Sequence, residues 1–135
     1  MIHLRRNFLK RCAALLAGSS LASAAIARPM KNPPFVHNVY FWMNNPDSAE
    51  ERSKLETGIK SLRGIDLVKG FHLGKPVPSE REVVDDSYSY HLMLQFNSPE
   101  DQTAYQTAPV HERFVADCSS LWSKVVVYDS SADLM

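Results

Sequence analysis

The 135-residue sequence predicts a single α+β domain in which a four-stranded antiparallel sheet carries helices on one face. One observation is the alternation of apolar and polar residues over 88–96, which is typical of a strand with one buried face. Another is that two helix starts combine a polar capping residue with proline, at Asn45-Pro46 and Ser98-Pro99. These signals place the elements in the order strand, helix, strand, strand, helix, strand.

The N-terminal residues are typical of a cleavable export signal. A basic start precedes an apolar run of 16 residues, 12–27, which ends in the small-residue site Ala25-Ile26-Ala27. This run is shorter than the roughly 20 residues of a stable membrane-spanning helix, so we expect no membrane anchor in the mature form. The segment Arg5-Arg6-Asn7-Phe8-Leu9-Lys10 resembles the twin-arginine export motif, which predicts a periplasmic or secreted protein. The predicted organisation is a signal peptide over 1–27, a proline-rich spacer over 28–34, a domain over 35–130 and a tail over 131–135.

The charge of the mature chain argues against nucleic acid as a partner. The whole sequence has 15 basic and 15 acidic residues, and cleavage after Ala27 removes four of the basic ones. The 11 basic and 15 acidic residues that remain give a net charge of −4, which does not attract a phosphate backbone. Cleavage also leaves Cys118 as the only cysteine, so the mature chain has no intrachain disulfide. We expect Cys118 to be a small buried residue.

The first predicted strand, over 35–43, is apolar on both of its faces. Its aromatic and β-branched residues favour a strand. A strand of this kind needs cover on both sides of the sheet. The residues of one face are Phe35, Val39, Phe41 and Met43, and those of the other are Val36, Tyr40 and Trp42.

A helix is expected next, with Asn45 as its cap and Pro46 in its first turn. Its core face consists of Leu55, Ile59 and Leu62, which are spaced at i, i+4 and i+7. We expect Gly64 to end this helix as a left-handed C-cap. A second strand is predicted over 67–73, followed by Gly74 and a charged loop over 75–87.

The third strand, over 88–96, leads into a helix that proline interrupts. Ser98 is the expected N-cap of this helix, and Asp101 lies three residues after it. Pro109 removes a helical hydrogen bond and displaces Ala108 from the helical region, so a second helix restarts at Pro109 and carries His111. The last strand is predicted over 122–128, and the residues after it are polar.

This order of elements is that of the ferredoxin-like fold. Helices on one face of the sheet leave the other face, with Tyr40 and Trp42, as an exposed apolar patch. Two copies that pack sheet on sheet would cover it, which predicts a homodimer in the form of a dimeric α/β barrel. Burial of ~600 Å² of apolar surface per partner is worth on the order of 15 kcal/mol before the costs of association.

The sequence resembles the stress-responsive A/B barrel (Dabb) domain family over about residues 35–129. That resemblance implies a dimeric α+β barrel, in agreement with the packing argument. It rests on segments that are weak alone and specific in their order and spacing: Val36-His37-Asn38-Val39-Tyr40-Phe41, Gly74, Ser87-Tyr88-Ser89-Tyr90, Phe96 with Ser98-Pro99-Glu100-Asp101, Tyr105-Gln106-Thr107-Ala108-Pro109-Val110-His111, and Val125-Val126-Val127-Tyr128-Asp129.

The resemblance also implies a set of site residues. A plant polyketide cyclase of similar pattern uses a tyrosine and a histidine around a cavity between sheet and helices, and these correspond to Tyr105 and His111 here. Another pocket histidine corresponds to His37, whose strand face also carries Phe35 and Val39. The sequence departs from these patterns in two places. Tyr90 replaces a third-strand histidine of the cyclase, and Ala108 replaces the histidine that the family has before the proline. The ligand-binding pocket expected from the resemblance thus contains His37, Tyr90, Phe35 and Val39.

Two interpretations of Tyr105 and His111 remain open. In one, His111 is a general base that removes a proton next to a carbonyl, and the Tyr105 hydroxyl hydrogen-bonds the enolate. In the other, His111 bonds a backbone carbonyl and fixes the broken helix, while Tyr105 fills the core. His37 is likewise either a polar group of the pocket or a hydrogen-bonded core histidine.

His72 and His91 lie close together if the second and third strands pair. Two imidazoles without a third ligand are a weak signal for a metal, so we expect both at the dimer interface or its rim. The sequence predicts no cofactor. Three functions remain: an exported dimer that binds a small apolar ligand, an enzyme of the cyclase or lyase type that uses His111 with Tyr105, and a haem- or metal-binding protein.

Overall fold

The structure of the protein is a computed structural model that describes residues 35–132. The predicted signal peptide, the spacer and the last three residues of the tail lie outside the described residues. Short 3-10 turns over Leu62–Gly64 and Ser119–Leu121 follow α1 and α3. The elements are β1 (Phe35–Met43), α1 (Ala49–Ser61), β2 (Gly70–Gly74), β3 (Tyr90–Phe96), α2 (Pro99–Gln106), α3 (Pro109–Cys118) and β4 (Trp122–Ser131).

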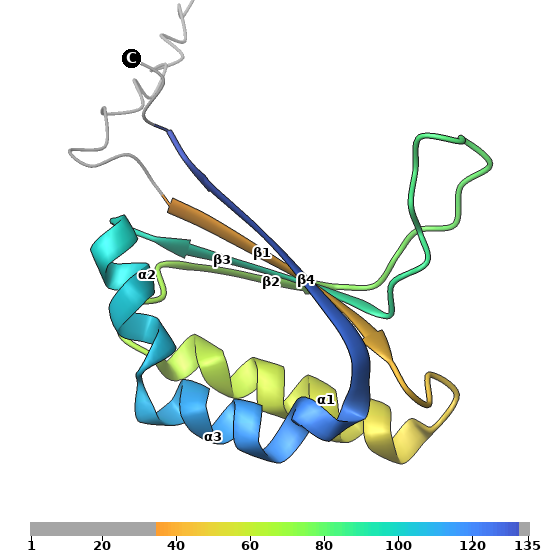
Figure 1. The fold of residues 1–135 in the computed structure, drawn as a ribbon, viewed down its shortest axis with the longest axis horizontal. Helices are drawn as coiled ribbons and strands as arrows, with labels where there is room; N and C mark the ends of the chain where they lie inside the picture. The colour runs from red at the N-terminus through yellow and green to blue at the C-terminus, as the bar shows by residue number, and fades with distance from the viewer. Residues whose placement is uncertain (1–34, 133–135) are drawn as a thin grey trace, which may run out of the picture.

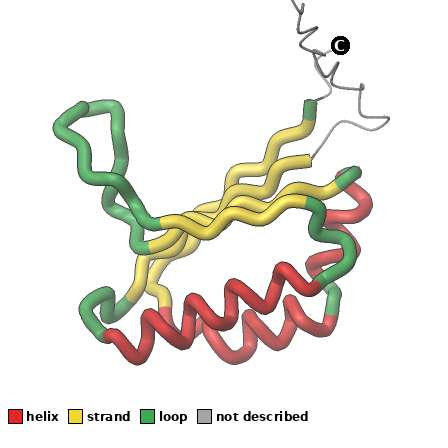
Figure 2. The backbone as a smooth tube through the Cα atoms, turned by 180° about the vertical axis from the view of Figure 1, so that it is seen from behind, coloured by secondary structure: helices red, strands yellow, loops and turns green. Residues whose placement is uncertain are grey.

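The four strands form one antiparallel sheet in the order β2-β3-β1-β4. The helices lie together on one face of this sheet (Figures 1 and 2). This arrangement confirms the predicted ferredoxin-like α+β fold. The central strand β1 places His37 between Leu94 of β3 and Asp129 of β4, on the face that the helices cover.

The start of α1 differs from the prediction. The helix begins at Ala49, and its N-cap is Ser48, whose Oγ accepts a hydrogen bond of 3.2 Å from the Glu51 backbone N–H. Residues 44–47 form a turn before it, so Asn45 and Pro46 precede the cap. The amide of Asn45 instead donates to the Glu51 carboxylate over 2.9 Å. Asn45 therefore stabilises the first turn from outside the helix.

The end of α1 also differs, because Gly64 is not in the left-handed region. The C-cap of α1 is Leu62, whose φ of −63° and ψ of −24° are right-handed. The chain continues there as a 3-10 turn over Leu62–Gly64. Leu62 is fully buried in the core, as are Leu55 and Ile59. Burial of Leu62 holds the last turn against the sheet, and this confirms the predicted core face of the helix.

Three strand limits were wrong by a few residues. A backbone hydrogen bond of 2.9 Å from Val68 N to Ile65 O forms a turn there, so β2 begins at Gly70 instead of residue 67. β3 begins at Tyr90, two residues later than predicted. β4 continues to Ser131 because its last residues pair with the start of β1.

The break between α2 and α3 is confirmed. Ser98 Oγ accepts a hydrogen bond of 3.1 Å from the Asp101 N–H, as expected for the N-cap of α2. Ala108 is extended, with φ −65° and ψ 135°, and α3 restarts at Pro109. The helices α1, α2 and α3 pack on one face of the sheet, and the core lies between them and the strands. The buried core residues are Val39, Phe41, Met43, Leu55, Ile59, Leu62, Ile65, Tyr90, Leu92, Leu94, Phe96, Tyr105, Phe114, Cys118 and Leu121.

No described helix covers the other face of the sheet (Figure 2). That face carries a strip of aromatic side chains. Tyr40 lies at its centre and stacks on His91, with ring centroids 4.5 Å apart and planes at 13°. Tyr88 and Tyr128 contact Tyr40 edge-on, at 5.0 and 6.1 Å. We call this strip, with Val36, Trp42, Met93 and Val126, the outer sheet face.

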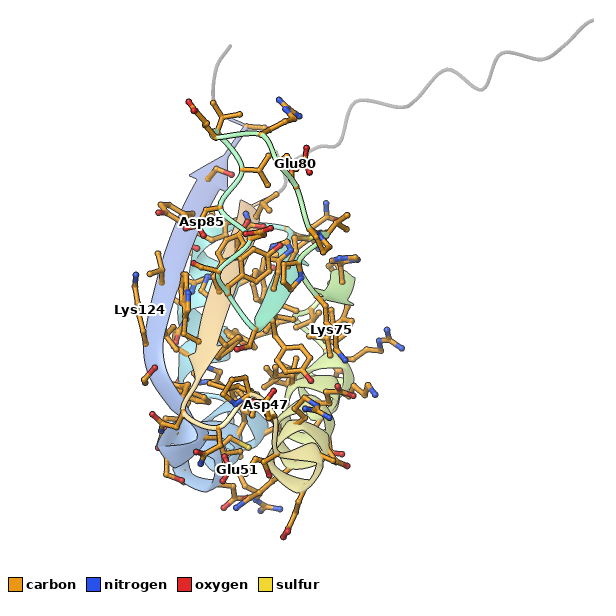
Figure 3. The ribbon with its side chains drawn as sticks, turned by 90° about the vertical axis from the view of Figure 1, so that its right-hand side faces the viewer. Asp47, Glu51, Lys75, Glu80, Asp85 and Lys124 are labelled. Carbon is orange, nitrogen blue, oxygen red and sulfur yellow. The ribbon has the colours of Figure 1, made fainter. Side chains whose placement is uncertain are left out.

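The segment over 75–89 joins β2 to β3 and extends beyond the sheet (Figure 1). Glu80 and Asp85 lie on it, while Lys75 lies at its base and Lys124 on the edge strand β4 (Figure 3). Its many exposed charged residues agree with the solvated loop predicted for this region. None of the helices in the described part of the chain is long and apolar enough to cross a membrane.

Gly58 lies on α1 where this helix packs against α3. A Cβ at this position would lie 2.7 Å from Cys118 Sγ and 3.0 Å from a ring carbon of Phe114. Helix propensity alone predicts that Gly58→Ala stabilises the protein by about 1 kcal/mol. We expect the opposite, a loss of about 1–3 kcal/mol in the free energy of unfolding, because the added methyl overpacks the interface. Chemical denaturation measures this difference.

The double variant Gly58→Ala/Cys118→Ala is the matched control. Removal of Sγ gives the new methyl room, so the loss should be smaller than the sum of the two single losses. A more stable Gly58→Ala variant would show that the helices separate without cost.

Candidate functional site

A cavity of about 230 Å³ lies between the sheet and the helices α2 and α3. Its walls are mostly aliphatic and aromatic. The polar groups of its lining are His37, Tyr105, Gln106 and His111, and the other residues are Val39, Phe41, Leu62, Leu92, Phe114, Val115, Trp122, Val125 and Val127.

The cavity opens at the edge strand β4. Val125 and Val127 line it, yet they are 37% and 45% exposed, and Val115 on α3 is 40% exposed. Side chains that line a cavity and also contact solvent mark its mouth. A ligand would therefore enter between β4 and α3.

His37 lies inside the cavity and is paired with a carboxylate. Its side chain is buried, and its Nδ1 is 2.6 Å from Oδ1 of Asp129. The two residues are direct partners in the register of β1 and β4, so their side chains lie on the same face of the sheet. A carboxylate accepts hydrogen bonds only, so Nδ1 carries the bridging proton and Nε2 remains for the cavity.

Tyr105, on α2, lies between the two histidines of the site. Its ring centroid is 6.1 Å from that of His37 and 4.5 Å from that of His111, and the ring packs on Phe96. The residue is 1% exposed, and its burial raises the pKa of the hydroxyl, which stays protonated at neutral pH. The Tyr105 side chain lines the cavity, so its hydroxyl can donate to a ligand bound there.

His111, in the first turn of α3, is held by the break between the helices. Its Nδ1 is 2.9 Å from the backbone carbonyl of Gln106, the last residue of α2. The carbonyl can only accept, so Nδ1 donates and Nε2 has the lone pair. Burial lowers the pKa of His111, and the nearby His37 lowers it further, against an opposing effect of the Gln106 carbonyl.

The geometry therefore unites the two interpretations of His111. It bonds a backbone carbonyl, as in the structural interpretation, and its ring also lines the cavity beside Tyr105, as in the chemical one. The site thus offers two imidazole nitrogens and one hydroxyl at one end of an apolar space. Such a set can bind a carbonyl oxygen and accept a proton from a neighbouring carbon.

Two predicted pocket residues lie elsewhere. Tyr90 is buried at the other end of the sheet, and its hydroxyl donates to Oε1 of Glu56 over 2.5 Å. Phe35 packs edge-on against Phe96 at 6.4 Å and does not line the cavity. Val39, by contrast, lines the cavity together with His37.

Asp129 is the site residue that sequence reasoning missed. Its polar surroundings, Asp129-Ser130-Ser131, suggested a tail beyond the last strand. The pairing of β4 with β1 over those residues is what brings its carboxylate to His37. The signal for it was an acidic residue two positions after Val127 on the same strand face, which a continued period-2 pattern would have included.

The pair His72 and His91 lies on the outer sheet face with ring centroids 5.7 Å apart. His91 Nε2 is 3.0 Å from Oδ1 of Asn38, so it is already hydrogen-bonded within the sheet. Within residues 35–132 no group of three histidine, cysteine or acidic side chains lies close enough to hold a metal ion. Cys118 is buried under α1, where desolvation raises the pKa of its thiol and makes it a poor nucleophile.

The domain matches a known family and several solved structures. The model of the stress responsive A/B barrel domain matches residues 35–132. A protein from Arabidopsis thaliana is 25% identical, over 75% of this chain and 97% of that one, with a TM-score of 0.64. A dimeric ferredoxin-like protein of unknown function from Thermobifida fusca is 16% identical, over 76% and 93% of the two chains, with a TM-score of 0.61.

An enzyme also shares the fold. The hydroxynitrile lyase from Passiflora edulis is 16% identical, over 76% of this chain and 95% of that one, with a TM-score of 0.65. At this identity the likeness extends to the fold alone. No curated protein sequence matches the chain.

The lowered pKa of His111 predicts a pH dependence of stability. Below about pH 6.5, the unfolded chain takes up a proton on this histidine that the folded chain resists. Unfolding is then favoured as the pH falls, so we expect the unfolding free energy to decrease from pH 7 to pH 5. His111→Asn should flatten this slope, as measured by denaturant titrations at each pH.

His91→Asn is the matched comparison, because burial and the nearby His72 lower the pKa of His91 in the same direction. Each variant should remove part of the slope, and the double variant should remove more. An unchanged slope in His111→Asn would mean that the ring is solvated in the folded protein.

Proposed function

Because the chain belongs to the stress-responsive A/B barrel domain family, we propose that it is an exported homodimer that binds a small, largely apolar molecule in its cavity. The carrying observation is the cavity itself, about 230 Å³ in volume, with apolar walls and polar groups gathered at one end. That combination is typical of a small-molecule site, where the walls supply affinity and a few polar groups fix orientation.

The polar end indicates the chemical class of the ligand. The Tyr105 side chain lines the cavity, and its hydroxyl can donate a hydrogen bond to an oxygen atom of the ligand. Both imidazoles use Nδ1 for a hydrogen bond to the protein, to Asp129 in His37 and to the Gln106 carbonyl in His111. Their Nε2 atoms therefore remain for a ligand. A small apolar molecule with a carbonyl group satisfies this hydroxyl and fills the remaining space against Val39, Phe41 and Leu92.

The homodimer covers the outer sheet face. Tyr128 is 65% exposed there, beside the half-buried Tyr40 and Met93. A soluble monomer rarely leaves such a continuous apolar surface in water. The Thermobifida fusca protein of the same fold is a dimer, which supports a second copy as the cover. A two-fold arrangement of sheet on sheet makes this face self-complementary.

Export is proposed on the sequence of the first 27 residues. The basic start, the apolar run and the small-residue cleavage site are those of a signal peptide. The twin-arginine pattern over Arg5–Lys10 favours transport of the folded protein. The domain would then form its cavity and its dimer before it crosses the membrane.

A second candidate function is an enzyme of the cyclase or lyase type. The observation that favours it is the joint presence of the Tyr105 hydroxyl and two imidazoles within one apolar cavity. An imidazole Nε2 takes a proton from the carbon next to a carbonyl, and the electron pair moves to the carbonyl oxygen. The Tyr105 hydroxyl stabilises that oxygen by a hydrogen bond. The Passiflora edulis enzyme shows that the same fold supports lyase chemistry.

Acetophenone is a suitable probe for the ligand site, because it joins a small aromatic body to a carbonyl. At ten times its dissociation constant it should stabilise the wild type by about 1.4 kcal/mol. Val127→Trp places a large side chain at the mouth of the cavity and should abolish this stabilisation. Thermal shift and NMR chemical-shift changes measure the binding.

Val110→Trp is the matched control, because Val110 is 40% exposed on α3 and does not line the cavity. It should bind acetophenone as the wild type does. Equal binding by Val127→Trp and the wild type would place the ligand outside the cavity.

Tyr128→Arg tests the dimer. The side chain is mostly exposed in one copy, so the substitution should cost little folding stability, yet it puts a charge into the proposed interface. We expect the wild type to sediment as a dimer at micromolar concentration and Tyr128→Arg as a monomer. Val110→Arg, on the helical side, should remain dimeric. A monomeric wild type would refute the homodimer.

Replacement of Arg5 and Arg6 by lysine tests the export route. Loss of the paired guanidinium groups should keep the precursor in the cytoplasm, as fractionation and N-terminal analysis of the product would detect. Arg11→Lys, outside the motif, should still yield a mature chain that begins at Arg28. Normal export of the double-lysine variant would indicate the general secretory route instead.

A further inference from the structure

The two imidazoles of the cavity differ in the group that holds Nδ1. Behind His37 lies the carboxylate of Asp129, with Nδ1 and Oδ1 2.6 Å apart. Behind His111 lies the backbone carbonyl of Gln106, at 2.9 Å. A carboxylate carries a full negative charge, while a carbonyl carries only a partial one. The two rings therefore respond differently when Nε2 takes up a proton.

Proton uptake turns a neutral imidazole into a cation. A carboxylate on the opposite nitrogen orients the ring and stabilises that cation. The Asp129 carboxylate is well placed for this role, because its Oδ1 lies only 2.6 Å from His37 Nδ1. A hydrogen bond this short is typical of a charge-assisted pair. His111 has no such partner, and its pKa is lowered by burial and then by the neighbouring His37.

We propose that His37 is the general base of this cavity, that Asp129 is its positioning residue, and that His111 orients Tyr105. This inference rests on the second candidate function, acid–base chemistry in the cavity. It reverses the sequence-based expectation, in which His111 was the base. The difference comes from Asp129, whose place opposite His37 follows from the pairing of β4 with β1.

The route of the proton is consistent with this assignment. His37 is buried, but the side chain of Asp129 is 39% exposed at the edge strand. The exposed Val125 and Val127 mark the mouth of the cavity on the same strand. After each reaction, His37 can therefore return its proton to water at this edge.

Few titratable groups face His37. They are Asp129 from β4, Tyr105 from α2 and His111 from α3. Tyr105 stays neutral at working pH because burial raises its pKa. Glu112 acts on His111, whose pKa it raises slightly against the effects of burial and His37.

A general probe of bases in apolar cavities is 5-nitrobenzisoxazole. The base removes the proton at C3, the C–H electron pair completes a nitrile, and the N–O bond breaks to release a nitrophenolate. The proton ends on Nε2 of His37, and the Tyr105 hydroxyl donates to the leaving oxygen. No other reactant is needed, and the nitrophenolate absorbs light, so the rate can be followed directly.

We expect saturable elimination by the wild-type protein. His37→Gln should lower kcat by about 100-fold or more, the usual share of a general base. Asp129→Asn should lower kcat by about 10-fold or more and leave KM nearly unchanged, because the neutral amide no longer stabilises the imidazolium that forms when Nε2 takes up the proton. His111→Gln should mainly raise KM and keep the wild-type pH profile. Asp117→Asn, an exposed carboxylate on α3 outside the site, is the matched control and should behave as the wild type.

The tautomers provide a test that does not depend on variant folding. ¹⁵N NMR of the wild type should show the proton of His37 on Nδ1, paired with Asp129. A proton on Nε2 in the resting protein would overturn the proposal. So would loss of kcat in His111→Gln with retention in His37→Gln.

Binding and turnover separate this inference from the function on which it rests. If NMR shows that the probe enters the cavity but the wild type does not accelerate its elimination, the assignment of His37 is refuted and ligand binding stands. If neither the probe nor acetophenone enters the cavity, the proposed function itself is refuted.

Discussion

The structure depends on the double apolar character of its central strand. β1 places His37, Val39, Phe41 and Met43 against the helices and Tyr40 and Trp42 on the opposite side. Because β1 lies between β3 and β4, both of its faces are continued by neighbouring strands. One face forms the core and the cavity, and the other forms the aromatic strip. The nine residues of β1 thus contribute to both the cavity and the outer sheet face.

The break between α2 and α3 brings polar side chains together inside the apolar core. In a continuous helix the six-residue spacing would keep the side chains of Tyr105 and His111 apart. The extended Ala108 and the restart at Pro109 instead fold His111 back onto the Gln106 carbonyl, with its ring 4.5 Å from that of Tyr105. A local cost in helical hydrogen bonds thus gives a polar cluster inside an apolar cavity.

The sequence was most informative where a pattern is local. The period of β3, the Ser98 cap and the proline break depend on neighbours in the chain, and each was predicted correctly. The cap of α1 was misplaced because Asn45 and Ser48 are both good capping residues, and only the path of the turn decides between them.

The site was harder to predict, since it depends on contacts across the sheet. His37, Tyr105 and His111 were identified by family resemblance, but Asp129 was not, because 92 residues separate it from His37. Tyr90 was assigned to the pocket because it stands where the similar cyclase has a histidine, but its hydroxyl donates to Glu56 on α1. A continued period-2 pattern could have placed Asp129 on the inner strand face, but the local sequence does not identify the partner of either contact.

The contact between His37 and Asp129 depends on the register of β1 and β4. The β1–β4 pairing has one irregularity, between Trp42 and Met43, at the far end from these two residues. Since side chains alternate, a slip of β4 by a single position would turn the Asp129 carboxylate away from the cavity and toward the opposite surface. The same slip would turn Val125 and Val127 out of the cavity and leave His37 without its carboxylate partner. The register of β4 therefore decides whether His37 and Asp129 meet, and a one-residue insertion between the irregularity and Asp129 would separate them.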